Sequence, residues 1–355
     1  MKTGRWVVLG VGVIVLGYLA FWPVPVDPEA WDPPEAPPLE GVYAPNAYLA
    51  GIERIDLPSG YGPEDVAVDS LGRIYAGLAD GRLVRMPRDA STVETFAETG
   101  GRPLGLDFDA GGNLLVADAK RGLIAYAPDG ARIILSTEAG GVPFGFTDDV
   151  DVAPDGKVYF SDASYKFSME DYVLDLVENR PNGRLLEYDP ATGATRILLD
   201  DLYFANGIAV SPDGAFVLVN ETARYRVRRY WLAGPKAGTS DFFAENLPGF
   251  PDGISSDGAG TFWVALVSPR NPVVDALGPW PSLRKVLVRL PEFLQPAPKR
   301  FAFVLGLDAE GRVVHNLQDP AAERLATISS VERYGEMLYF GSLEEPALGR
   351  IEAPK

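Results

Sequence analysis

Four residues with carboxylate or carboxamide side chains occupy the same position in copies of an internal repeat. Each copy has an apolar strand, a D-x-G-type turn and a second strand of alternating residues. Aligned on the turn, the residues that open the first strand are Glu64, Leu104, Asp148, Asn206, Asp252 and Ser329. Three carboxylates and one carboxamide therefore share one register. If the fold gathers this register in one place, the acids repel one another unless a cation lies between them.

Mixed Asp, Glu and Asn side chains are the ligands that calcium prefers, with water and substrate completing six to eight oxygens. The chain has no Cys and one His, which argues against zinc or copper. Each residue alone is more often a turn cap at the start of a strand. Their coincidence at one register favours a calcium site made of Glu64, Asp148, Asn206 and Asp252. The following acids, Asp65 and Asp149, are expected to support the site rather than bind the metal.

The repeat itself predicts the fold. Its turn glycines fall near positions 72, 112, 156, 214, 258 and 335, and the strands are rich in β-branched and aromatic residues. Six copies of a multi-strand unit indicate an all-β, six-bladed β-propeller over residues 47–355, because each blade buries its faces only against its neighbours. The innermost strands of a propeller line a central channel, so one register forms a ring around it. An irregular β-sandwich is the alternative.

Composition narrows the function classes. The 355 residues carry a net charge of −17, which argues against nucleic acid as a partner because phosphate binding needs a basic face. The absence of Cys excludes disulfides and thiol nucleophiles. A single histidine, His315, excludes mechanisms that need two, and its place in an outer strand indicates a structural or surface role. The oligomeric state cannot be predicted from these features.

The N-terminus predicts a membrane anchor over residues 1–22. The run from Trp6 to Trp22 has no charge, and aromatic residues lie near both of its ends. Lys2 and Arg5 precede the run and acids follow it, which places the propeller on the periplasmic or extracellular side of a single-pass protein. A cleaved signal peptide is the alternative, although no small-residue cleavage site follows the run. Residues 23–46, which are rich in proline, are expected to form a stiff spacer that holds the propeller away from the bilayer.

Several longer stretches resemble a known family. They are GRPLGL (101–106), VADAKRGL (116–123), YFSDASYKFSMEDYVLD (159–175), GRLLEYD (183–189), LPGFPDGI (247–254) and LQDP (317–320). In these the chain resembles the strictosidine synthase-like family of calcium-dependent propellers, and most of all its adipocyte plasma membrane-associated branch. The wider group includes paraoxonases and gluconolactonases. The resemblance implies a six-bladed fold, a catalytic calcium, and hydrolysis of lactones, aryl esters or phosphotriesters.

Carried over residue by residue, the resemblance makes Glu64, Asn206 and Asp252 calcium ligands. Asp148 stands where relatives usually have asparagine, which adds a negative charge to the site. Ala326 stands where strictosidine synthase has its glutamate, so condensation of an amine with an aldehyde is not expected. Ala119 stands where paraoxonases have a histidine above the metal.

Two functions remain open. The first is a metal-dependent hydrolase of small-molecule esters or lactones, in which Asp148 or Asp252 acts as general base or nucleophile. The second is a non-enzymatic propeller whose calcium only joins the blades and whose upper face binds a ligand or protein. The insertion over residues 266–299, with Arg284, Lys285 and Arg289, is interpreted as a lid, as a segment that lies on an anionic bilayer, or as a plain surface helix or strand. Candidates for the pocket walls, each of which alone is more often a core residue, are Phe144, Phe146, Tyr165, Phe167, Phe204 and Phe250.

Overall fold

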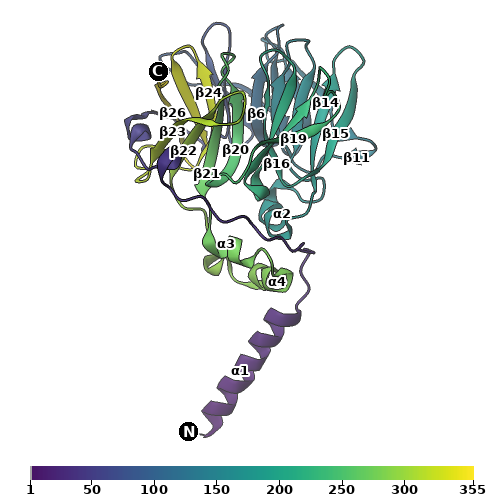
Figure 1. The fold of residues 1–355 in the computed structure, drawn as a ribbon, viewed down its shortest axis with the longest axis vertical. Coiled ribbons are helices and arrows are strands. Elements are labelled where there is room, and N and C mark those ends of the chain that lie inside the picture. The colour runs from purple at the N-terminus through teal and green to yellow at the C-terminus, as the bar shows by residue number, and fades with distance from the viewer. Residues whose placement is uncertain (1) are drawn as a thin grey trace.

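Six four-stranded antiparallel sheets make up the body of the computed structural model, which describes residues 2–355. Their first strands contact one another in a closed cycle, from β2 through β6, β12, β16, β20 and β24 back to β2. The predicted six-bladed propeller is therefore confirmed (Figure 1). Its innermost strands are β2 (Val66–Val68), β6 (Pro103–Phe108), β12 (Thr147–Val152), β16 (Ala205–Val210), β20 (Gly249–Ser256) and β24 (Ile328–Tyr334).

The other strands follow outward from the channel in chain order. Blade one continues with β3 (Ile74–Gly77), β4 (Arg82–Met86) and β5 (Glu94–Glu98), and blade two with β7 (Leu114–Asp118), β8 (Gly122–Tyr126) and β9 (Arg132–Ser136). Blade three has β13 (Val158–Asp162), β14 (Gly183–Asp189) and β15 (Ala194–Leu202), and blade four has β17 (Phe216–Glu221), β18 (Arg226–Trp231) and β19 (Ser240–Ala244). Blade five has β21 (Phe262–Pro269), β22 (Ala302–Leu307) and β23 (Val313–Asp319). A small hairpin, β10 (Glu138–Ala139) with β11 (Val142–Pro143), joins blades two and three.

The ring is closed by the two ends of the propeller sequence. Blade six contains β24, β25 (Met337–Ser342) and β26 (Ala347–Glu352), and its outermost strand is β1 (Glu53–Asp56), which pairs with β26. The sixth blade therefore takes one strand from the beginning of the chain and three from its end. This pairing covers the edge that β26 would otherwise expose.

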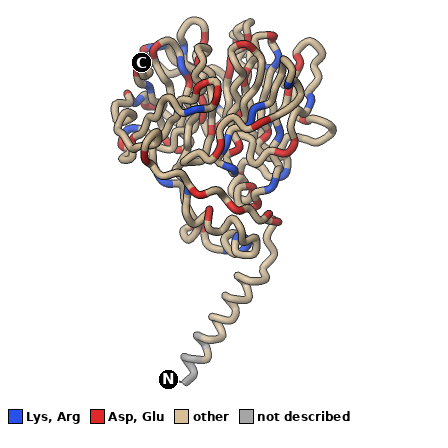
Figure 2. The backbone as a smooth tube through the Cα atoms, viewed as in Figure 1, with Lys and Arg blue, Asp and Glu red and all other residues tan. Residues whose placement is uncertain are grey.

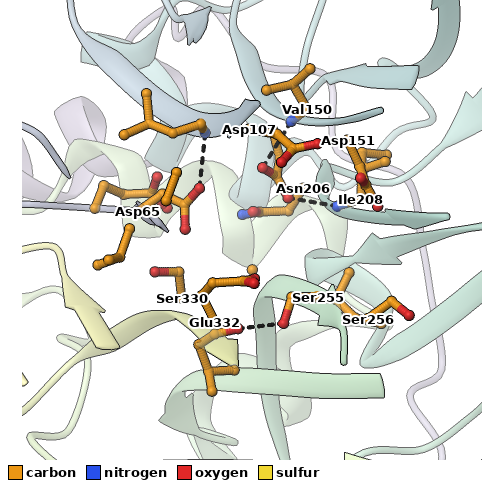
Figure 3. Close-up of a pocket in the computed structure, with 18 of the residues that line it drawn as sticks. Asp65, Asp107, Val150, Asp151, Asn206, Ile208, Ser255, Ser256, Ser330 and Glu332 are labelled. Atoms are coloured by element: carbon orange, nitrogen blue, oxygen red, sulfur yellow. Dashed lines mark hydrogen bonds between the residues drawn. The ribbon is translucent and has the colours of Figure 1, made fainter. Parts of the chain in front are cut away.

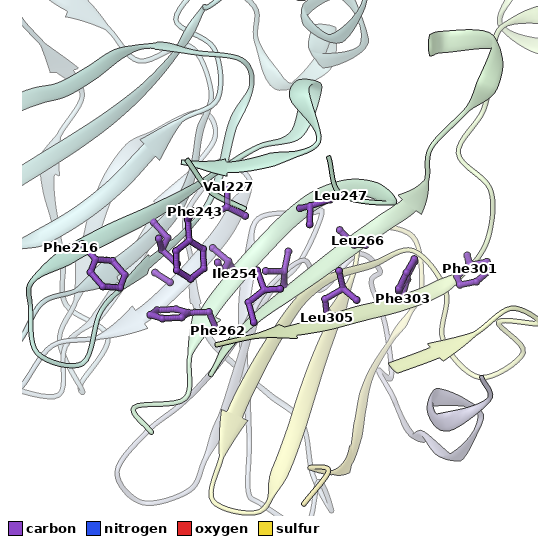
Figure 4. Packing of buried hydrophobic residues seen from close by; sticks show 14 residues of the cluster. Phe216, Val227, Phe243, Leu247, Ile254, Phe262, Leu266, Phe301, Phe303 and Leu305 are labelled. Carbon is purple, nitrogen blue, oxygen red and sulfur yellow. The ribbon is translucent and has the colours of Figure 1, made fainter. Parts of the chain in front are cut away.

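The core lies between the blades. The largest cluster fills the space between blades four and five, where Phe216, Phe243 and Phe262 pack with ring centroids 5.5–6.2 Å apart (Figure 4). Equivalent clusters lie at the other blade interfaces. The blades thus hold one another through apolar contacts, and the channel between them is free to carry polar side chains.

All the helices of the propeller lie at one end of the channel. In each blade the first strand begins at this end, and the connection between the second and third strands returns to it. Such connections contain η3 (Met169–Asp171) and α2 (Tyr172–Glu178) in blade three, and η4 (Thr222–Arg224) in blade four. Blade five contributes α3 (Pro272–Leu277), α4 (Pro281–Arg289) and η5 (Glu292–Leu294). The openings of the innermost strands therefore face the helices, and Figure 1 shows α2, α3 and α4 between the propeller and α1 (Lys2–Phe21).

Helix α1 covers the predicted anchor, and its described apolar side chains are exposed; Val13, Ile14 and Leu16 keep about 70% of their surface. Figure 2 shows an uncharged tube along most of α1, with Lys and Arg where α4 meets the N-terminal segment. Measured for length and apolarity, none of the helices in residues 2–355 qualifies as a membrane span.

The proline-rich segment, predicted as a stiff spacer between anchor and propeller, makes backbone contacts with the propeller's helical end. The Glu29 amide donates to the Glu178 carbonyl at 3.0 Å, and the Trp31 amide donates to the Gly278 carbonyl at 3.1 Å. Further along, two short turns, η1 (Gly41–Tyr43) and η2 (Tyr48–Gly51), pack against blade five. The segment therefore runs along the propeller, because its carbonyls and amides find partners on the helices there.

The basic residues of the blade-five insertion also differ from the expectation of a bilayer-facing surface. Arg284 is 5% exposed and donates to the Glu29 carbonyl at 2.7 Å. Lys285 lies 3.4 Å from the Asp27 carboxylate, and Arg289 donates to the carbonyls of Trp22 and Leu19. These cations hold the N-terminal segment against α4, and Arg284 is buried there, so this residue does not face a bilayer.

Candidate functional site

The predicted ring residues lie where the innermost strands bulge. The pairing of β12 with β13 skips between Thr147 and Val150, which leaves Asp148 and Asp149 outside the regular ladder. The same irregularity occurs around Asn206 in β16 and around Asp252 in β20. A bulge re-aims the side chains it contains. One residue of each bulge belongs to the ring, and the next faces the neighbouring blade.

Three carboxylates of the ring are buried together. Glu64, Asp148 and Asp252 are 5%, 3% and 6% exposed. Burial raises the pKa of Glu64 and of Asp148 well above the usual range, and for both groups the largest charge acting in the same direction is that of Asp252. Burial also raises the pKa of Asp252 to about 7. The register that the repeat predicted therefore does bring the acids together, and they repel one another.

Asp252 is the best-held member of the ring. Asn206 Nδ2 donates to its Oδ1 at 2.6 Å, and Asn220 Nδ2, from β17, donates to its backbone carbonyl at 2.6 Å. Thr222 Oγ1 fixes the preceding residue by donating to the Pro251 carbonyl at 2.7 Å. The second carboxylate oxygen of Asp252, Oδ2, is buried without a hydrogen-bond partner among the described residues. A buried carboxylate oxygen without a donor is costly, so this atom favours a cation as its partner.

The donor set fits a hard cation by its chemistry. Glu64, Asp148 and Asp252 supply carboxylate oxygens, and the Asn206 amide can present its oxygen after a half-turn of the amide group. Across residues 2–355, no three acidic or histidine side chains already stand in a metal-binding arrangement. In the structure the Asn206 amide directs its nitrogen, not its oxygen, toward Asp252.

One positive charge faces the ring, and sequence reasoning missed it. Arg102 is 6% exposed, and its guanidinium donates to the Gly62 carbonyl at 2.8 Å. Its charge lowers the pKa of both Glu64 and Asp148, although less than burial raises them. The available signal was an arginine two residues before Leu104, directly ahead of the apolar start of β6. Asn220 and Thr222 gave no comparable signal, because they lie in another blade's second strand and the turn after it.

A second tier of acids lies below the ring and joins neighbouring blades. Asp65 accepts the Leu106 amide at 2.9 Å, and Asp149 accepts the Ile208 amide at 2.7 Å, each across a blade boundary (Figure 3). Asp107 and Asp151 repeat the pattern with the amides of Val152 and Val210. These contacts agree with a supporting role for Asp65 and Asp149. The amides that donate to these carboxylates belong to the innermost strands, which have no neighbouring strand of their own sheet on the channel side.

The neighbouring glycines make room for these acids. A Cβ atom on Gly207 would collide with the backbone of Asp252 and Ile254, and one on Gly105 would collide with Asp149. A Cβ on Gly253 would lie 2.7 Å from the Ser329 carbonyl. The innermost strands therefore approach one another as backbone against backbone, which draws the ring residues toward the axis.

The channel is too small to hold a substrate. Its cavity has a volume of about 150 Å³ and is lined by Glu64, Asn206 and the acids of the lower tier. Ligand pockets usually enclose about 300–1,000 Å³. A substrate must therefore approach the ring from the end that carries the helices. Tyr172 opens α2 at that end, and burial, followed by the charge of Asp252, raises its pKa.

An apolar wall borders the ring on one side. Leu104, the ring residue of blade two, clusters with Ala119, Phe146 and Phe204, and the two phenylalanine rings meet edge to face at 5.7 Å. Phe146 and Phe204 were predicted as walls, whereas Phe144 packs on Phe160 and Phe250 on Tyr225. His315 stacks on Trp263 in blade five, at a ring distance of 5.2 Å.

Fold and ring together define a six-bladed propeller with buried acids converging at one end of its channel. Family models agree with this class: strictosidine synthase matches residues 148–235, and the N-terminal strictosidine synthase-like model matches residues 41–86. The adipocyte plasma membrane-associated protein of Bos taurus is 37% identical over 95% of this chain and 87% of its own length. Strictosidine synthase-like protein 7 of Arabidopsis thaliana is 37% identical over 87% of this chain and 83% of its own. The chain therefore belongs to the family of strictosidine synthase-like and adipocyte plasma membrane-associated proteins.

Solved structures support the same architecture. A gluconolactonase from Xanthomonas campestris superposes with a TM-score of 0.63 at 18% identity, over 93% of this chain and 98% of its own. The calcium-binding protein regucalcin from Agrobacterium tumefaciens has a TM-score of 0.57 at 14% identity, over 84% of this chain and 92% of its own. At such identities the likeness shows the fold.

Proposed function

We propose that this protein is a membrane-anchored, calcium-dependent hydrolase of small-molecule esters or lactones. The observation that carries the proposal is the group of three buried carboxylates at the ring, with Asp252 Oδ2 lacking any partner. Removing charged groups from water costs several kcal/mol for each ion unless a counter-ion is present. The gluconolactonase and the calcium-binding regucalcin that share the fold are consistent with this chemistry.

Glu64, Asp148, Asn206 and Asp252 would hold the calcium. When bound, calcium supplies a Lewis acid that polarises the substrate carbonyl. Asp148 or Asp252 takes the proton of the attacking water. The apolar wall of Leu104, Phe146 and Phe204 packs against the hydrocarbon part of the substrate.

The membrane part of the proposal is supported by α1 and by the relatives. The described apolar side chains of α1 are exposed in the isolated chain, and burying them in lipid removes this surface from water. Lys2 and Arg5 at its start favour the cytoplasm for the N-terminus and the periplasm or an extracellular space for the propeller. The ring opens at the same end as α1, so substrate enters from the side that faces the bilayer.

The test uses the full-length chain in neutral detergent, after chelation. Phenyl acetate and a panel of γ- and δ-lactones are assayed with and without calcium, beside Asp252→Ala and the control Asp200→Ala, an exposed carboxylate on β15. We expect calcium-dependent turnover in the wild type and in the control, and none in a folded Asp252→Ala protein. Turnover that persists without calcium, or in Asp252→Ala, contradicts the proposal.

The second candidate is a scaffold in which calcium joins the blades without catalysis. It is favoured by Ala119 and Ala326, both buried, at positions where relatives carry reactive side chains. Calcium that raises the melting temperature while no ester or lactone is hydrolysed would select this function.

A further inference from the structure

A second cavity lies where the N-terminal segment crosses blades three and four. Its volume is about 470 Å³, and it shares no lining residue with the central channel. It belongs to the end of the propeller that carries the helices, because η4 forms part of it. Its lining comes from Glu29, Ala30, Trp31, Pro181, Asp201, Tyr203, Arg224 and Arg226. In size it matches a site for a small molecule or a lipid headgroup.

Arg224 carries a buried charge into this cavity without an acidic partner. It is 8% exposed, its Nε has no hydrogen-bond partner among the described residues, and its Nη2 lies 3.5 Å from the Asn179 carbonyl. The guanidinium lies between two aromatic rings, 3.7 Å from the centroid of Tyr203 and 4.4 Å from that of Trp31. Rings of this kind only partly replace the water that a buried ion loses. Arginine cannot lose its proton, so the charge remains.

A second buried guanidinium lies close by. Arg284 is 5% exposed and donates only to backbone carbonyls, that of Glu29 at 2.7 Å and that of Leu176 at 3.4 Å. Burial lowers the pKa of Arg284 to about 10, and the charge of Arg224 acts in the same direction. Two positive charges that repel each other are therefore buried at the junction of the N-terminal segment with the propeller.

The acids around the cavity are engaged elsewhere. Glu221 pairs with Arg226 at 2.6 Å, and Asp201 pairs with Arg228 at 2.5 Å. Glu29 lies 3.8 Å from Arg180, and its charge is the smallest of those that act on Arg224. The neighbouring Arg226 and Arg228 thus have acidic partners. Arg224, which lines the cavity, has none among the described residues.

We propose that this cavity binds a phosphate-type oxyanion, with Arg224 as its principal ligand and Arg284 adding positive potential. Guanidinium groups bind phosphate oxygens through paired, charge-assisted hydrogen bonds. The bound anion supplies the negative charge that Arg224 lacks among its described neighbours. A free phosphate or phosphate ester and the phosphate of a lipid headgroup share this chemistry. The cavity can meet a headgroup because it lies at the end of the propeller from which α1 extends.

The test titrates the full-length chain in neutral detergent, in phosphate-free buffer with a calcium chelator and constant ionic strength. One arm adds inorganic phosphate, and the other adds dihexanoylphosphatidic acid, with dihexanoylphosphatidylcholine for comparison. Binding is followed by calorimetry and by the melting temperature. The variants are Arg224→Gln, Arg224→Lys and the control Arg229→Gln, whose guanidinium is already paired with Asp241 at 2.8 Å.

We expect saturable binding to the wild type, with the melting temperature raised by about 4 °C at 100 times the Kd. Arg224→Gln should weaken binding at least about 10-fold, because a hydrogen bond to a charged group is lost. Arg224→Lys should retain part of the affinity, and Arg229→Gln all of it. Saturation by inorganic phosphate identifies a free anion, and saturation only by phosphatidic acid identifies a headgroup. Both results support the site.

Absence of saturable binding to the wild type in either arm overturns the proposal, whatever the variants do. An equal loss of anion affinity in Arg224→Gln and Arg229→Gln also overturns the proposal, because the anion then binds outside the cavity. If Arg224→Gln does not fold, the test compares the anion affinities of Arg224→Lys and the wild type. A buried arginine satisfied by aromatic rings and carbonyls alone would give no response to either anion.

Discussion

Replacing Asp252 by asparagine should stabilise the calcium-free protein above neutral pH. Burial raises the pKa of this carboxyl from 3.8 to about 7 in the folded protein. Between these two values the folded state holds a proton that the unfolded state has lost, so the free energy of unfolding falls as the pH rises. At 1.36 kcal/mol per pKa unit, the full loss by about pH 8 amounts to about 4 kcal/mol. Asparagine has the same shape without the charge, and Asp252→Asn removes this loss.

The assay compares wild type, Asp252→Asn and the control Asp200→Asn in neutral detergent with a chelator. Unfolding by urea is followed from about pH 4.5 to pH 8.5. The stability difference between Asp252→Asn and the wild type should be near zero at the acidic end and grow as the pH rises. A variant that is less stable than the wild type at pH 8 would refute the reasoning, and so would a difference that does not change with pH.

Calcium should reverse the sign of the effect. At 100 times its Kd, a ligand that binds only the folded state stabilises it by about 2.7 kcal/mol. Calcium should raise the free energy of unfolding of the wild type by this amount. It should raise that of Asp252→Asn by much less, because one carboxylate of the ring is gone. Equal responses to calcium in both proteins would show that Asp252 does not bind the metal.

Three further substitutions test how the fold holds the site. Arg184→Met leaves Asp162 buried without its ion pair of 2.6 Å and should cost about 3–5 kcal/mol in urea unfolding. Asn220→Ala removes the donor to the Asp252 carbonyl, which should cost about 1–3 kcal/mol and weaken calcium binding measured by calorimetry. Gly207→Ala places a Cβ against the backbone of Asp252, so the strands must separate; we expect about 1–3 kcal/mol of destabilisation and a reduced response of the melting temperature to calcium.

Each of these has an outcome that contradicts it. Wild-type stability in Arg184→Met would show that the buried pair contributes nothing beyond packing. An unchanged calcium affinity in Asn220→Ala would separate the position of Asp252 from metal binding. In Gly207→Ala, an unaltered calcium response would mean that the close approach of β16 and β20 does not set the ring.

The sequence alone was sufficient for the number of blades, and it predicted which residues share one register of the innermost strands; that these residues bind a metal stays a prediction. Both depend on local signals: turn glycines and alternating strands recur in each blade, and one register of every innermost strand must face the channel. Glu64, Asp148, Asn206 and Asp252 were therefore found without knowledge of any contact. Their mutual repulsion follows from the symmetry of the fold.

Only the tertiary structure decided what depends on residues far apart in the chain. The pairing of β1 with β26, the charge of Arg102 near Glu64 and the support of Asp252 by Asn220 leave no periodic trace in the sequence. Composition predicted a stiff spacer for residues 23–46, because prolines stiffen a chain whatever lies beside it. The partners of Glu29 and Trp31, by contrast, belong to helices more than one hundred residues away. Such contacts depend on which surfaces the closed ring places side by side, and the spacing of residues along the chain carries no record of that.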